Sequence, residues 1–429
     1  MLVLQKIYNS FYKNKFLAIY TIALLGELAL IHSVSDLPST LGNWIEKSRV
    51  IAGFGIPQDN FYGPGSAILL IPFLPLQEHL FLANLVYFGL GTIGFWKLTG
   101  YISNKIWRAV CLIALPTNIY LVWLINSSQD TVFEFFLLIW ASLFLARKRY
   151  LLFSLFAFLL CLSRSGYWIF FLGTSVGMFL WGKFRRNELS WKKLIAVPLL
   201  VLTSAFNFAN YDSPSPALEG GLALYFSYTK YHYLSLPKMD MDVFLSGPNG
   251  PFSEKNGPRF PEEISQSEEN SIYAKAGLDS LTRYKKESVL GWMQKFDSYF
   301  FDVQKIPHLP GAYVLNQDEQ IIEIQEERLT WPLVLGNFSY MLWRTLLVLG
   351  ALLALGIVLG SKLVGASLGR VKLWPLALPY LFGVVPGLII YTETRFKIVS
   401  ELLLVPLIVE IWSKATALYS QRKRSVEKS

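Results

Sequence analysis

A lone carboxylate, Asp36, follows shortly after an apolar run that extends from Phe16 to Ile31. An acid at the boundary of a membrane can act as a general base or orient an acceptor nucleophile. The same polar loop continues to an aromatic turn, Tyr62-Gly63-Pro64-Gly65. A structural alternative is open for Asp36, because Asp-Leu-Pro-Ser-Thr is also typical of a turn followed by a helix start.

Three cations have side chains suited to binding a phosphate. Arg395 and Lys397 stand beside Glu393 in the run Glu-Thr-Arg-Phe-Lys, and Arg164 lies in a polar break between two apolar runs. Arg binds phosphate through a bidentate fork, whereas Lys binds it as a point charge. Two alternatives are structural: snorkelling to the membrane surface with a local Glu393–Arg395 pair, and an ion pair between helices for Arg164.

Two acids mark the beginning of another apolar run. Asp130 stands at its start, where a carboxylate complements the positive end of a helix, so that capping is the favoured interpretation. Glu134 follows one turn later and is expected to face the interior of the protein.

The sequence gives little support to a zinc site or a nucleotide-binding site. His32, His79, His232 and His308 are scattered, without the spacing of a zinc site. The sequence has no Walker loop and no Gly-x-Gly-x-x-Gly after a strand. No cofactor is therefore assigned, and a divalent metal is left open.

The elements that position these residues must be membrane helices. Hydrophobic residues make up 53% of the 429 residues, charged residues only 16% and aromatic residues 15%. A soluble domain of this size would need more charge to cover its surface. The formal charge of +9 comes largely from basic residues that flank apolar runs, which indicates membrane topology and argues against a nucleic-acid partner.

A spanning helix needs about 20 mostly apolar residues. Ten spans are predicted, near 16–33, 80–98, 109–125, 130–146, 150–163, 166–182, 194–210, 332–359, 375–391 and 400–418. The basic clusters at 147–149, 183–193, 362–372 and 422–424 then share one side, which predicts cytoplasmic N- and C-termini. Asp36, Asp130, Arg164 and Glu393 fall on the outer side.

Two apolar stretches are not predicted to cross the membrane as single helices. A single helix from Tyr150 to Trp181 would run about 48 Å, which is too long for a bilayer core. Its two flanks are both basic, so a hairpin with Ser163-Arg164-Ser165-Gly166 at its tip is predicted. The segment from Ser66 to Leu76 is too short to span and is bounded by prolines, so it is expected in the outer interface or as a segment that dips in and returns.

The predicted fold class is an all-α polytopic membrane protein. Residues 1–210 form an N-terminal transmembrane module with a first external loop over 34–79, and residues 211–331 form an external loop subdomain in which Ile272 to Leu290 could be a short amphipathic helix. Residues 332–418 form the C-terminal transmembrane helices, and 419–429 a basic cytoplasmic tail. The protein is expected in the bacterial inner (plasma) membrane.

These features, in their order, resemble the GT-C superfamily of polytopic glycosyltransferases, which includes protein O-mannosyltransferases and aminoarabinose lipid A transferases. Its members carry an acid early in the first external loop, then a small-residue segment, a Tyr-Pro-Pro-Gly-like turn and an apolar interfacial stretch. The similar positions here are Asp36, Ser48 to Gly53, Tyr62 to Gly65, Ser66 to Phe73, the polar turn Asn126 to Asp130, Arg164, and Glu393-Thr-Arg395-Phe396.

The resemblance implies a GT-C-like fold and an inverting transfer of a sugar from a polyprenyl-phosphate-linked donor on the outer face. The acceptor would be a lipid, a glycan or a protein. Asp36 would deprotonate or orient the acceptor hydroxyl, and fixed cations would hold the donor phosphate. The implied phosphate ligands are Arg164, Arg395 and Lys397, with Asp130, Glu393 and Tyr62 in supporting positions.

Other classes of protein stay open. An O-antigen-type polysaccharide polymerase or ligase would depend on external residues such as His232 or His308 with Arg259 or Arg283. A transporter would need ionisable residues near mid-membrane and broken helices in matched halves, and almost every ionisable residue in the predicted spans lies near an end. A non-catalytic membrane protein is a further alternative.

Overall fold

The computed structural model describes residues 15–34, 44–57, 64–127, 130–186, 191–216, 220–227, 258, 261, 264–300, 313–315, 321–323, 331–363, 371–389 and 397–426. Asp36, Tyr62, Glu393 and Arg395 lie outside the described residues. So do His232, His308 and Arg259.

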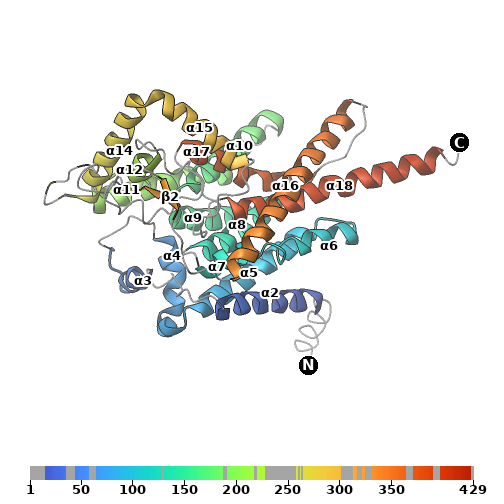
Figure 1. Ribbon diagram of the computed structural model, residues 1–429, viewed down its shortest axis with the longest axis horizontal. Helices are drawn as coiled ribbons and strands as arrows, with labels where there is room; N and C mark the ends of the chain where they lie inside the picture. The colour runs from blue at the N-terminus through green and yellow to red at the C-terminus, as the bar shows by residue number, and fades with distance from the viewer. Residues whose placement is uncertain are drawn as a thin grey trace.

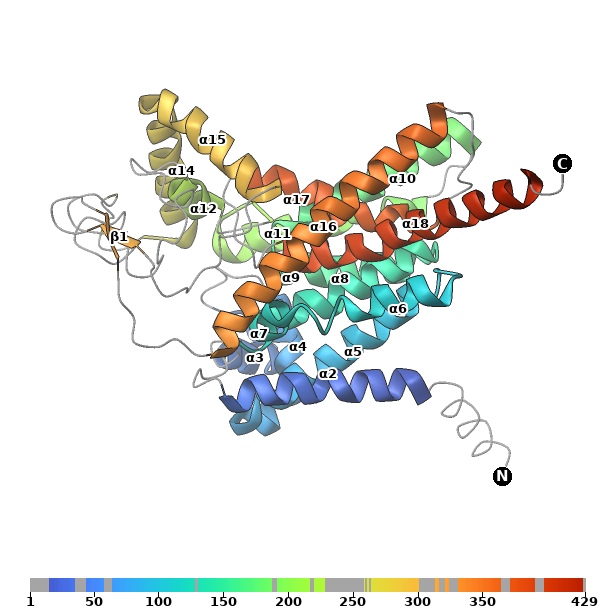
Figure 2. The same cartoon turned by 45° about the vertical axis from the view of Figure 1, so that its right-hand side comes forward.

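Helices make up nearly all of the described structure, and long apolar helices lie side by side in a bundle (Figures 1 and 2). The first half contains α2 (Lys15–Val34), α3 (Ile45–Ala52), α4 (Gly65–Leu70), η2 (Ile71–His79), α5 (Phe81–Thr99), α6 (Lys105–Ile113), α7 (Ile119–Ser127), α8 (Thr131–Ala146), α9 (Tyr150–Ser163), α10 (Tyr167–Arg186), η3 (Trp191–Lys193) and α11 (Ala196–Tyr211). The second half contains α12 (Gly220–Ser227), α14 (Gln266–Arg283), α15 (Lys285–Phe300), β1 (Tyr313–Leu315), β2 (Ile321–Glu323), α16 (Trp331–Leu363), η5 (Trp374–Ala377), α17 (Leu378–Ile389) and α18 (Ile398–Val426). The strands β1 and β2 pair antiparallel.

Several helices are long and apolar enough to cross a membrane. Among the described residues, three meet that description outright: α2, α5 and the Phe338–Ser361 part of α16. A fourth is added if α7 and α8, bent by 118° relative to one another, count as one broken span. The helices α9 and α11, and the Tyr167–Leu180 part of α10, are apolar but shorter. The described structure is therefore that of an all-α protein with helices able to span a membrane. The number of ten spans stays a prediction.

One predicted span, 109–125, is wrong as a continuous helix. The helix α6 ends at Ile113, a turn follows, and α7 begins at Ile119. Pro116 lies in this turn and has no backbone N–H to continue the helix. The side chain of Asn118 then accepts a hydrogen bond from the backbone N–H of Leu121 at 3.1 Å, which caps the new helix.

The predicted hairpin between α9 and α10 is confirmed. The first helix ends at Ser163 and the second begins at Tyr167, which leaves Arg164 in the break. The two helices pack on each other, with the Phe153 ring centroid 6.0 Å from that of Phe170 and 5.8 Å from that of Phe171. Because the break is only three residues long, the side chain of Arg164 is held where the two helices meet.

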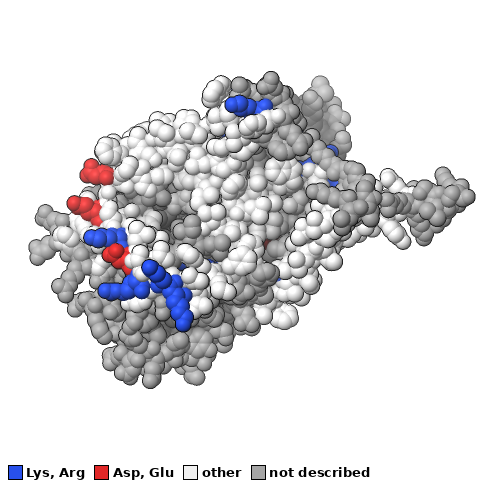
Figure 3. Space-filling view, turned by 90° about the horizontal axis from the view of Figure 1, so that it is seen from above, with Lys and Arg blue, Asp and Glu red and all other residues white. Residues whose placement is uncertain are grey.

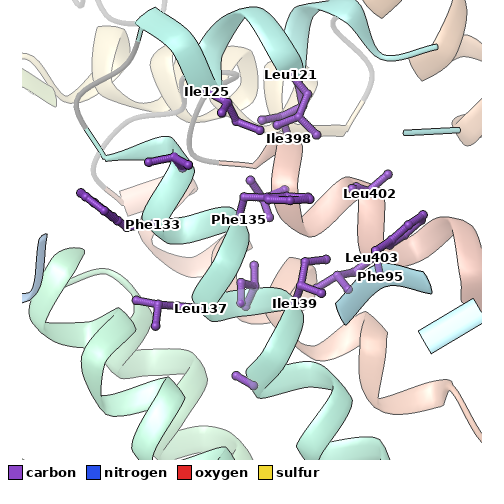
Figure 4. Packing of buried hydrophobic residues seen from close by; sticks show 14 of the residues in the cluster. Phe95, Leu121, Ile125, Phe133, Phe135, Leu137, Ile139, Ile398, Leu402 and Leu403 are labelled. Atoms are coloured by element: carbon purple, nitrogen blue, oxygen red, sulfur yellow. The ribbon is translucent and has the colours of Figure 1, made fainter. Parts of the chain in front are cut away.

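The helix α8 is the centre of the bundle, and its side chains are buried on nearly every side. Figure 4 shows this packing, with Phe133, Phe135, Leu137 and Ile139 of α8, Leu121 and Ile125 of α7, Phe95 of α5, and Ile398, Leu402 and Leu403 of α18. Between helices in a membrane, close packing through small residues replaces the hydrophobic driving force. Gly91 of α5 supplies it here, because a Cβ at that position would come within 2.3 Å of the Phe135 ring.

The described part of residues 211–331, the segment predicted to be external, contributes a further group of helices. The helices α12 and α14 pack through Tyr225 and Tyr273, whose ring centroids are 5.5 Å apart. The predicted single helix over Ile272 to Leu290 is divided between two helices, since α14 ends at Arg283 and α15 begins at Lys285. Figure 3 shows one group of charged side chains at the end where α14 lies, a few basic side chains at the upper edge, and a broad face between them with almost none.

Candidate functional site

Arg164 and Asp130 lie together at the point where α8, α9 and α10 meet. Asp130 precedes α8, and Arg164 ends α9. The Arg164 Nε donates to Asp130 Oδ2 at 2.7 Å, and its Nη2 donates to Asp130 Oδ1 at 2.5 Å. This is the bidentate fork that makes Arg–carboxylate pairs both strong and directional. Arg164 is 8% exposed and Asp130 19%, so the pair is largely shielded from solvent.

A second carboxylate completes this group, which we call the Arg164 cluster (Asp130, Glu134, Arg164 and Tyr167). Glu134 is fully buried, forms an ion pair with Arg164 Nη1 and accepts a hydrogen bond from the Tyr167 hydroxyl. Two carboxylates therefore share one guanidinium, and the cluster carries one acid more than it has bases. Removing a partner from such a buried group leaves charge uncompensated, which is costly.

Gly65, the first residue of α4, lies against the residue that precedes Arg164. A Cβ at Gly65 would lie 2.5 Å from the backbone nitrogen of Ser163, the residue before Arg164. Only glycine permits that approach. The short helix α4 that follows is buried, and the Ser48 hydroxyl of α3 donates to the Ala67 carbonyl at 2.9 Å. The segment from Ser66 to Leu76, predicted to be too short to span, lies within α4 and η2.

A second buried ionic group joins α15, α16 and α18, and we call it the Arg344 cluster (Tyr299, Tyr340, Arg344, Lys397 and Glu401). Arg344 Nη1 lies 3.6 Å from Glu401 Oε1, and the Tyr340 hydroxyl donates to Glu401 Oε2 at 3.0 Å. Arg344 and Glu401 are both almost fully buried. With Lys397 included, this cluster has one base more than it has acids.

The carbonyl of Tyr299 is the centre of the Arg344 cluster. It accepts from Arg344 Nη2 at 2.6 Å, from the Tyr380 hydroxyl at 3.2 Å and from Lys397 Nζ at 3.3 Å. Tyr299 is in the last turn of α15, where carbonyls lack partners within the helix and the helix dipole is negative. The two cations thus stabilise the end of the helix and fix α15 to the bundle.

The two clusters are neighbours. The helices that carry them pack on one another: α8 contacts α18, and α10 and α15 both contact α17. Lys397 also directly precedes α18, whose first turns pack against α7 and α8 (Figure 4). A buried zone with fixed charges of both signs can hold an anion and a polar nucleophile in set positions.

A shallow hollow lies at the end of α2, two residues before Asp36 in the chain. It is lined by His32 and by residues 77–82. The His32 ring stacks on Phe81 with centroids 3.9 Å apart, and its Nδ1 shares a hydrogen bond of 2.8 Å with the side-chain oxygen of Asn126. The polar turn that leads to Asp130 is therefore held against the end of α2.

The described part of the predicted site comes together as follows. Asp130 occupies the N-cap position of α8, but its side chain makes no capping bond and binds Arg164 instead. For Arg164, the geometry is that of an ion pair between helices, and Lys397 is buried against Tyr299. The phosphate-binding roles of Arg164 and Lys397 stay predictions, as do all roles of Asp36, Tyr62, Glu393 and Arg395.

Sequence reasoning missed Arg344, Glu401 and Tyr299. Arg344 lies well inside the predicted span 332–359, and an ionisable residue in such a run is itself a signal of a functional or tightly paired site. Its partners come from helices remote in the sequence, so their identity was not visible. Among the described residues, no group of three or more His, Cys, Asp or Glu could hold a metal ion, and a divalent metal stays open.

Comparisons with known proteins identify no relative: no family model, no curated protein and no solved structure matches the chain.

Proposed function

We propose that the protein is a membrane glycosyltransferase that moves a sugar from a polyprenyl-phosphate-linked donor to a lipid, glycan or protein acceptor. The observation that carries the proposal is the burial of fixed cations, Arg164 in one cluster and Arg344 and Lys397 in the other, within an apolar bundle of helices. An amphiphilic donor needs a lipid-facing protein with fixed cations for its phosphate. A donor held on a lipid carrier also fits a sequence without a Walker loop.

Each predicted residue has a step in this reaction. The acceptor hydroxyl attacks the anomeric carbon, Asp36 takes its proton, and the bond from that carbon to the phosphate oxygen breaks. The polyprenyl phosphate leaves as an anion, which Arg395 and Lys397 stabilise. Arg164 can join them only by giving up part of its contact with Asp130 or Glu134, since its guanidinium is shared between both. Tyr62 and Glu393 are proposed to support these groups.

The test is sugar transfer by the purified full chain in proteoliposomes, with a panel of labelled polyprenyl-phosphate sugars as donors. Asp36→Asn is expected to lower transfer about 10²–10⁴-fold, the usual contribution of a general base. Glu46→Gln is the matched control, because Glu46 is an acid of the same stretch, is 79% exposed and pairs with the surface residue Arg49. Equal activity of the two variants would refute the role of Asp36.

The rival polymerase or ligase has a different signature. It predicts that loss of activity follows substitution of His232, His308, Arg259 or Arg283, while Asp36→Asn stays active. Arg283 is exposed at the end of α14. Parallel assays of the two sets of variants separate the reactions.

A further inference from the structure

The helix α15 has its faces reversed relative to those of a helix on the surface of a soluble protein. The residues on its buried face are mostly small or polar: Ser288, Gly291, Lys295 and Tyr299. Beyond Lys286, the exposed residues whose side chains the structure describes are large and apolar, between 44% and 65% exposed: Val289, Leu290, Trp292, Met293 and Phe296. A helix in water normally turns its apolar stripe towards the core. The outward stripe of α15 therefore indicates a surrounding of low polarity.

The two ends of α15 differ in polarity, as the aqueous and apolar sides of a membrane interface do. At its start, Arg283, Lys285 and Lys286 are exposed. At its end, Tyr299 is buried and bonded to Arg344 and Lys397 of the bundle. Figure 2 shows α15 running from the α14 end of the molecule to α17. The helix thus passes from a basic, solvated end to the side of an apolar helix.

The contact with α17 continues this path into the bundle. The Tyr299 hydroxyl donates to the Tyr380 carbonyl at 2.8 Å, and a Cβ at Gly383 would lie 2.7 Å from the same hydroxyl. The helix α17 is itself apolar and exposes Leu381 and Val385. The apolar stripe of α15 is therefore continuous with the uncharged surface of the bundle.

We propose that α15 lies in the outer leaflet of the membrane, with its apolar stripe in the acyl chains and with Arg283, Lys285 and Lys286 on anionic lipid headgroups. The chemistry of the surface matches that partner at both ends. Trp and other aromatic side chains favour the interfacial zone, and Lys and Arg at its rim bind lipid phosphates. The segment predicted as wholly external would then contain a membrane-bound helix.

Spin-label accessibility in vesicles tests this placement. A label is attached to Met293→Cys in the full chain, in which the buried Cys111 and Cys161 have been replaced by Ser. The vesicles contain phosphatidylcholine and phosphatidylglycerol. Collision of the label with oxygen is expected to exceed collision with a water-soluble nickel chelate. Lys275→Cys, on the exposed face of α14, is the matched control and is expected to show the opposite order.

Other occupants give other results. Nickel access at Met293 equal to that at Lys275 would place the stripe in water and overturn the proposal. Low access to both reagents would mean a protein cover, and spin–spin broadening would identify that cover as a second copy of the chain. A label at Val289, one turn away on the same stripe, repeats the test if the Met293 variant does not fold. Equal depth of the Val289 label in vesicles without phosphatidylglycerol would overturn the assignment of anionic headgroups.

Discussion

Arg164→Met removes the only base of the Arg164 cluster and leaves Asp130 and Glu134 without their shared guanidinium. The wild-type contacts include two hydrogen bonds to Asp130, at 2.5 and 2.7 Å, and an ion pair with Glu134. Breaking a buried ion pair by removing one partner costs about 3–5 kcal/mol. With two carboxylates affected, we expect a loss at the upper end of that range, about 5 kcal/mol.

The assay measures the free energy of unfolding of the purified protein in mixed micelles. Unfolding is induced by titration with a denaturing detergent. Arg49→Met is the matched control, because Arg49 pairs with Glu46 at 3.2 Å on the surface, and both side chains are more than half exposed. Its expected cost is about 0–1 kcal/mol. Adding Asp130→Asn and Glu134→Gln to Arg164→Met removes the uncompensated charges and should restore part of the loss. A loss for Arg164→Met no larger than that for Arg49→Met would refute the reasoning.

Three further predictions concern packing, the position of α15 and pH. Gly91→Ala should cost about 1–3 kcal/mol in the same unfolding assay, because its Cβ would overlap Phe135, whereas Gly356→Ala has nothing within 4 Å and should cost little. Arg344→Met should speed amide exchange in α15 and leave that in α14 unchanged, because it removes the 2.6 Å bond to Tyr299; unchanged exchange in α15 would count against the clamp. Hydrogen bonds from the backbone and then the side chain of Ser265 lower the pKa of Glu268 below its usual 4.5, so the first turn of α14 should be protected above that pH and lose protection as the pH falls through the lowered value. Glu268→Gln should flatten this pH dependence of amide exchange, and a profile identical to that of the wild type would contradict the prediction.

Apolar run length was enough to locate most helices, because a long apolar segment has few other stable structures. The basic flanks of residues 150–181 likewise predicted the hairpin that holds Arg164. The break at Pro116 carried a local signal, a proline followed by the capping residue Asn118, but average hydropathy obscured it. The end of α14 at Arg283 had no comparable signal.

Side-chain partners were far less predictable than helices. Asp130 is at a helix start, which favours capping. Its carboxylate instead accepts hydrogen bonds from the charged guanidinium of Arg164, which are stronger than a bond from a backbone N–H. Arg344, Glu401 and Tyr299 meet only because α15, α16 and α18 pack together, and no short-range pattern encodes that contact. The reversed faces of α15 also depend on knowing which side of the helix touches the bundle.

The most direct measurement is photo-crosslinking of the reconstituted full chain with a polyprenyl phosphate that carries a diazirine on its lipid chain near the phosphate. Binding of a lipid-linked donor at the two clusters predicts labelled peptides from residues 390–400 and from the hairpin around Arg164. Unlabelled polyprenyl phosphate should remove that labelling. Labelling confined to other helices, or labelling that the competitor leaves unchanged, would contradict a donor site between the Arg164 and Arg344 clusters.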